Sequence, residues 1–87
     1  MRVALWHARC VQIFVDDEGY LHWIAANESR YVVNTRRRPS PDYIRLHAAT
    51  HGVGWTTTYL KVCGRRRELE TWARTVGGRV DPCTRCL

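Results

Sequence analysis

The pair Cys83-x2-Cys86 carries the strongest chemical signal in this 87-residue sequence. Two cysteines separated by two residues allow one tight turn to bring both thiolates onto a single metal ion. Pro82, directly before the pair, restricts the approach of the chain. A redox pair of the thioredoxin type opens a helix, and the single residue after Cys86 leaves no room for one. The spacing therefore predicts two metal ligands.

Two histidines supply the rest of a four-ligand set. Structural zinc is held by four ligands, and the spacing His47-x3-His51 lies in the range seen for paired zinc histidines. Together with Cys83 and Cys86 they predict one structural Zn²⁺ in a Cys2His2 site. Cys63 is an alternative ligand that would replace either histidine, and its other interpretation is a small buried hydrophobe.

The sequence offers little for catalysis or for a membrane. It contains no HExxH pattern, no nucleophile–base pair and no glycine-rich phosphate loop, so we expect neither an enzyme nor a small-molecule substrate. We find no signal-peptide pattern and no run of about 18 apolar residues, so we expect a cytoplasmic protein with reduced thiols. A secreted module with two disulfides is the alternative.

Four strands are expected to position these ligands. Apolar, β-branched runs predict strands at Val11–Val15, Arg30–Asn34, Tyr43–His47 and Thr58–Cys63. The last of these is expected to run antiparallel to the strand before it. Two prolines and a charge run make residues 36–42 a surface loop.

Two helices complete the expected fold. Asp16 or Asp17 is a good N-cap for a short helix from about Glu18 to Asn27, and the inward face is expected to carry Leu21, Ile24 and Ala25. A second helix is predicted by Leu69, Trp72, Ala73 and Val76 at positions i, i+3, i+4 and i+7, and Gly77-Gly78 ends it. Residues 1–87 are thus expected to form one α+β domain with a small antiparallel sheet of about four strands, two helices and a C-terminal zinc-binding turn.

The charge is uneven along the chain and suggests a polyanionic partner. Residues 1–28 have a net charge of −2 and the remainder +8, for a total of +6. We expect arginines to contact phosphate and Trp55 to stack on a base, as in a nucleic-acid-binding module. A run of arginines at a helix N-terminus also opposes the helix dipole, which an anion would relieve. The candidate contacts are Arg36, Arg37, Arg38, Arg45, Trp55, Arg65, Arg66 and Arg67.

A protein-binding module is the alternative. The chain has four tryptophans and four tyrosines, and Trp6 and Trp23 have no expected core position. Aromatic residues and arginines are the usual anchors of protein interfaces. A phage-encoded effector that binds a host protein would fit this composition. Charge runs that are merely solvated, with Trp55 packed on the core, would account for the same residues.

Several strings resemble a family of small actinobacterial and actinophage zinc-binding domains. They are Gly19–Ile24, Tyr31–Thr35, Pro41–His51, Tyr59–Gly64, Leu69–Ala73 and Cys83-x2-Cys86, which together span roughly residues 16–87. In that family the position of His51 is usually Cys, within a Leu-His-Arg-Ala-Thr-Cys type of string. Exchange of Cys for His preserves a zinc ligand, so the resemblance implies that His51 binds the metal. It implies a source and a metal but no activity.

Overall fold

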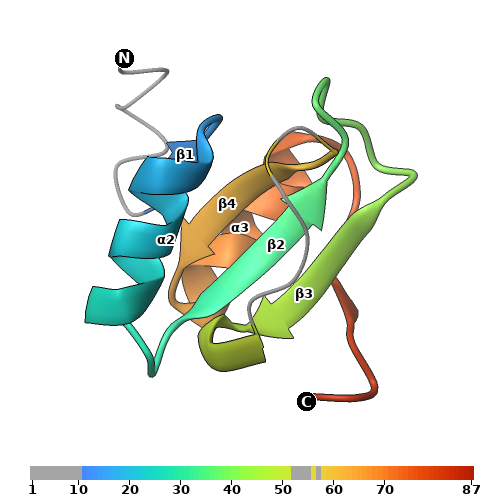
Figure 1. Cartoon of the computed structure of the whole chain (residues 1–87). Helices are drawn as coiled ribbons and strands as arrows, with labels where there is room; N and C mark the ends of the chain where they lie inside the picture. The colour runs from blue at the N-terminus through green and yellow to red at the C-terminus, as the bar shows by residue number, and fades with distance from the viewer. Residues whose placement is uncertain (1–10, 52–55, 57) are drawn as a thin grey trace.

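The computed structural model describes residues 11–51, 56 and 58–87, with His51 described by its backbone alone (Figure 1). Its elements are β1 (Gln12–Phe14), α2 (Asp17–Ala26), β2 (Tyr31–Thr35), β3 (Ile44–Ala48), a 3-10 turn (Ala49–His51), β4 (Leu60–Gly64), α3 (Arg66–Thr75) and β5 (Asp81–Pro82). Two helices and a mostly antiparallel sheet confirm the predicted α+β class.

The five strands form one sheet in the order β1-β4-β2-β3-β5, and all neighbours are antiparallel except β3 and β5. The expectation that β4 runs antiparallel to β3 was wrong, because both strands pair antiparallel with β2, which lies between them, and therefore run parallel to each other. Val33 of β2 pairs with Leu46 on one side and Val62 on the other. Val32 and Val33 point to opposite faces and are both buried, so β2 gains most from the central position.

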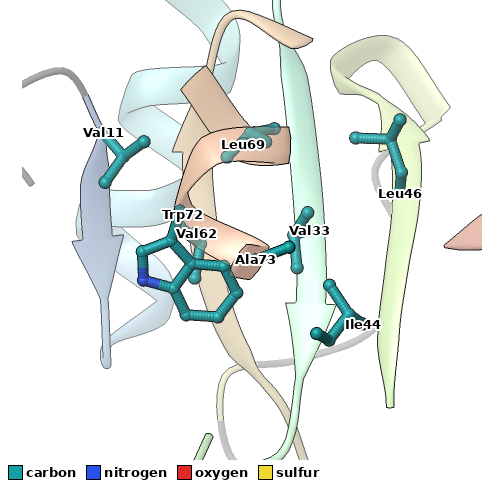
Figure 2. Close-up of a cluster of buried hydrophobic side chains, with 8 residues drawn as sticks. All are labelled: Val11, Val33, Ile44, Leu46, Val62, Leu69, Trp72 and Ala73. Carbon is teal, nitrogen blue, oxygen red and sulfur yellow. The ribbon is translucent and has the colours of Figure 1, made fainter. Parts of the chain in front are cut away.

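One face of the sheet packs against α3 and forms the main apolar core (Figure 2). Leu69, Trp72 and Ala73 face the sheet, as their spacing predicted. The strands contribute their alternate residues, and the buried cluster comprises Val11, Val33, Ile44, Leu46, Val62, Leu69, Trp72 and Ala73. Gly77 ends the helix with a φ of 87°, a left-handed conformation that favours glycine.

The opposite face packs against α2, which begins at the predicted cap. The Asp16 carboxylate accepts a hydrogen bond of 2.8 Å from the backbone N–H of Gly19. Tyr20 is buried, and Trp23 and Ile24 are partly buried against the same cluster. The expected inward face was wrong in part, because Leu21 is 53% exposed and Ala25 is also exposed. The two aromatic rings bury more area than Leu21 and Ala25 could, which sets the rotation of the helix.

A buried lysine also lies on the α2 face. The Lys61 ammonium donates a hydrogen bond of 2.6 Å to Asn34 Oδ1 and lies 5.1 Å from the centre of the Tyr20 ring. The ring of Tyr59 lies 5.9 Å away from it. Burial lowers the pKa of Lys61 to about 8, and the nearby Cys63 and Asp17 oppose that shift. The buried ammonium group of Lys61 is thus stabilised by these protein groups in place of water.

Within the described ranges, neither helix is long and apolar enough to cross a membrane.

Candidate metal centre

The chain leaves α3 and returns along the outer edge of β3, which places the two C-terminal cysteines beside His47. Gly78 lies so close to this edge that a Cβ atom there would be 3.0 Å from side-chain atoms of both Ile44 and Pro41. Asp81 and Pro82 then pair with Arg45 and Leu46 in parallel. The absence of a side chain at residue 78 therefore allows the tail to reach β3.

Three ligand atoms meet at this edge. The side-chain donor atoms of His47, Cys83 and Cys86 all lie within 4.8 Å of one another, and Cys86 Sγ is 3.9 Å from His47 Nδ1. Around a tetrahedral zinc ion, a sulfur–nitrogen separation of about 3.6 Å and a sulfur–sulfur separation of about 3.8 Å follow from the usual bond lengths. A small contraction would bring the three atoms onto one ion, so this donor set fits a metal.

Backbone groups hold both sulfurs in place. The N–H of Cys83 donates to the carbonyl of Leu46 at 2.8 Å, and the N–H of Ala48 donates to Cys86 Sγ at 3.4 Å. The backbone N–H groups of Arg85 and Cys86 lower the pKa of the Cys83 thiol, because they stabilise its thiolate. The tail therefore favours the thiolate form of Cys83, which is the form that binds metal.

Burial differs among the three residues. His47 and Cys83 are buried, whereas Cys86 is half-buried. Each of the three described cysteines, Cys63, Cys83 and Cys86, is free of a disulfide. The site is thus closed on the side of the sheet and more open at Cys86.

The fourth predicted ligand, His51, ends the 3-10 turn that directly follows β3. Its side chain lies outside the described residues, so the cluster of ligand atoms is defined by the other three.

The alternative ligand, Cys63, is not brought into this cluster. Val32 pairs with His47 on one side and with Cys63 on the other, so strand β2 separates the thiol from the imidazole. Cys63 is instead buried with Tyr20, Val32 and Ala49, and this burial raises the pKa of its thiol. These surroundings match the other interpretation of Cys63, a small buried hydrophobe.

The two predicted arginine triplets lie at opposite ends of the sheet. Thr35 pairs with Leu60 at one end of β2, and Tyr31 pairs with Gly64 at the other. Residues 36–38 leave β2 at the first end, while residues 65–67 follow β4 at the second. The candidate phosphate contacts therefore do not form one continuous patch, and Trp55 lies outside the described residues.

Arg36 and Arg37 at the first end, and Arg45 of β3, have intramolecular partners. Arg36 forms an exposed ion pair of 2.9 Å with Asp42, and its guanidinium lies 5.8 Å from the centre of the Tyr43 ring. Arg37 donates to the backbone carbonyl of Thr56. Arg45 lies 3.3 Å from the carboxylate of Asp81. These contacts give Arg36, Arg37 and Arg45 structural partners.

The triplet at the start of α3 is partly compensated by acidic residues. The backbone N–H of Arg65 donates to Glu68 at 2.8 Å, and Arg66 pairs with Glu70 at 3.4 Å. All three arginine side chains are exposed. The unfavourable effect of the helix dipole on the triplet is thus relieved locally by Glu68 in the first turn of α3, without a requirement for a bound anion.

No family model, curated protein or solved structure matches the chain.

Sequence reasoning missed three contributions to this site. Strand β5 pairs with β3 through two exposed residues, and a strand of two residues is too short to show a periodic pattern in the sequence. The N–H groups that hold Cys83 and Cys86 belong to the backbone, which sequence patterns do not reveal. The glycine pair Gly77-Gly78 predicted the end of α3, but the requirement for glycine at residue 78 arises from a close approach to β3.

Proposed function

We propose that this protein is a small domain stabilised by one structural Zn²⁺ ion, bound by His47, Cys83, Cys86 and His51. The observation that carries this proposal is the convergence of three donor atoms within 4.8 Å. Two sulfurs and an imidazole nitrogen favour zinc over harder ions such as Mg²⁺ or Ca²⁺. The ion would link β3 to a tail that otherwise pairs with the sheet through only two residues.

Metal content tests the ligand set. Wild-type protein is expected to contain one equivalent of zinc by mass spectrometry of the purified protein, and C83S is expected to lose it. The matched control is C63S, which removes another buried thiol and should retain the metal. Stoichiometric zinc in C83S, or loss of zinc in C63S, would contradict the proposed site.

Zinc removal is also expected to lower stability. The site scarcely exists in an unfolded chain, so binding of the ion contributes to folding by several kcal/mol or more. Chelation should therefore lower the melting temperature of wild-type protein. It should leave the melting temperature of C83S unchanged, because that variant has no metal to lose.

The proposed partner is nucleic acid, bound at the end of the sheet where the metal centre lies. Ala48, Tyr31 and Gly64 form one row across three strands. Arg30 directly precedes Tyr31, and Arg65 directly follows Gly64. The arginines at this end are Arg30, Arg65, Arg66, Arg67 and Arg85. Arg65, Arg67 and Arg85 are exposed, whereas Arg36 and Arg37 at the other end already have partners. A net charge of +6 supports the same class of partner.

Salt-dependent binding tests this partner. Fluorescence anisotropy of zinc-loaded protein with labelled single- and double-stranded DNA and RNA is expected to show affinity that falls steeply with salt. The double variant R65Q/R67Q should weaken binding to all sequences and lower the logarithmic salt slope by about 2. The control R36Q/R38Q, at the other end, should have the smaller effect. Absence of binding at low salt would make the basic surface a solvated face.

A protein-binding module, such as a phage-encoded effector for a host protein, is the second candidate. The observation that favours it is a groove beside α2 whose lining residues are aromatic, polar and acidic.

A further inference from the structure

Helix α2 lies beside the edge strand β1 (Figure 1). Residues of these two elements line a groove that has no role in the metal site. Its volume is about 480 Å³, which falls within the range of sites that take a small ligand or a large side chain. The residues that line it are Gln12, Phe14, Asp16, Glu18, Gly19, His22, Trp23, Ala26 and Asn27. The groove is therefore large enough to hold one long side chain of a partner.

Aromatic rings form one wall of this groove. Phe14 from β1 and Trp23 from α2 are both half-buried, with ring centres 6.5 Å apart and planes inclined by 50°. Gly19 keeps the space beside Phe14 open, since a Cβ atom at this position would lie 3.2 Å from Phe14 Cδ1. A flat group could thus enter and lie against an exposed part of the rings.

The charge of the groove is opposite to that of the chain. Its lining includes the carboxylates of Asp16 and Glu18 and no lysine or arginine, although the net charge of the protein is +6. Asp16 Oδ2 accepts the capping hydrogen bond from Gly19. The positive end of the α2 dipole opposes a cation here, and the run Asp16, Asp17 and Glu18 offsets it. The groove therefore favours a cationic occupant.

We propose that this groove binds an arginine side chain of a partner peptide. Its guanidinium stacks on Trp23 and forms an ion pair with Glu18. Arginine fits better than lysine, because a planar guanidinium stacks on aromatic faces and also presents several donors to carboxylates. The lining of the groove includes none of the arginines proposed for nucleic acid, so substitutions at Glu18 and at Arg65 and Arg67 test the two kinds of binding separately.

A pair of matched peptides tests the proposal. Acetyl-Gly-Arg-Gly-amide is titrated into ¹⁵N-labelled, zinc-loaded full-length protein, and the citrulline peptide, a neutral analogue of similar shape, serves as control. The arginine peptide is expected to shift the amides of Gln12 and Gly19 and the indole of Trp23 in a saturable manner. The citrulline peptide should bind at least fivefold more weakly. Equal binding of the two peptides, or shifts confined to other regions, would overturn the proposal.

Two variants with the same loss of charge distinguish the groove from general electrostatics. E18Q is expected to weaken binding of the arginine peptide by about threefold to tenfold. E28Q, which alters an exposed residue in the turn after α2, should change it by less than twofold. Equal effects of the two variants would overturn the proposal. A dimer of the protein that E18Q dissociates and the peptide displaces would identify a second copy as the occupant, and would also overturn it.

Discussion

The two faces of the sheet bury their side chains in different ways. On the α3 face, Val33, Leu46 and Val62 meet an apolar helix stripe, and the packing requires no polar partner. On the α2 face, Lys61 and Asn34 lie among aromatic rings and depend on each other. The first face gains stability from area removed from water. The second gains less, because a buried charge must be compensated at every contact.

The residues that form most of the apolar core and the residues that could bind a ligand therefore lie on different faces of one small sheet. The α3 face carries most of the apolar core, while the candidate ligand His47, the arginine-binding groove and Lys61 all lie on or beside the other face. A chain of 87 residues has a small free energy of unfolding, so loss of the packing on either face of the sheet should lower it measurably.

The largest expected effect lies on the α3 face. L69A removes a fully buried side chain and should lower the free energy of unfolding by about 2–5 kcal/mol, because a cavity remains in the core. Chemical denaturation measures the loss. The control L21A alters an exposed leucine on α2 and should change it by about 0.5 kcal/mol or less. Comparable losses in both variants would show that the two faces do not differ as described.

The second prediction concerns Lys61 and pH. The pKa of Lys61 falls from 10.5 in the unfolded chain to about 8 in the fold. As pH rises through about 8, the folded state therefore loses the lysine proton while the unfolded state still holds it. The contribution of Lys61 to stability should therefore increase with pH, by about 1 kcal/mol between pH 7 and pH 9. This gain continues toward pH 10.5.

The matched variant is K61M. The Cys63 thiol interacts with Lys61, so both proteins are compared in a C63S background. The difference in unfolding free energy between the proteins with and without K61M then isolates the lysine. Chemical denaturation at pH 7, 8 and 9 measures it. A difference that stays constant over this range would show that Lys61 is not desolvated in solution.

The smallest expected effect is at the sheet edge. R45Q removes an exposed ion pair with Asp81, and such pairs contribute about 0–1 kcal/mol. The loss should disappear in high salt, which screens exposed charges. A loss of several kcal/mol that persists in high salt would mean that Arg45 acts through burial, as Lys61 does.

Parts of this fold follow from local patterns. The stripe Leu69, Trp72 and Ala73 predicted α3 because a helix buries every third or fourth residue, and Asp16 predicted the start of α2 because a cap acts within one turn. The inward face of α2 was partly wrong, because the choice between Leu21 and Tyr20 depends on what the sheet offers.

Non-local features were harder to predict. The place of β4 beside β2 depends on competition among strands, and the short strand β5 has only two residues. For the metal site, the spacings Cys83-x2-Cys86 and His47-x3-His51 predicted three residues that do converge, His47, Cys83 and Cys86. Cys63 was retained as the alternative ligand, because the sequence does not show that strand β2 lies between Cys63 and His47.

The tail that carries Cys83 and Cys86 also covers the outer edge of the sheet. An uncovered strand presents a row of unpaired N–H and C=O groups, which is a template for pairing with another molecule. The carbonyl oxygen of Leu46 accepts a hydrogen bond from this tail, and the N–H of Ala48 donates one to it, so neither group is available to a neighbouring chain. Detachment of residues 81–87 would therefore expose the unpaired N–H and C=O groups of β3. A molecule with these residues detached would be prone to aggregate through this edge before the rest of the fold unfolds.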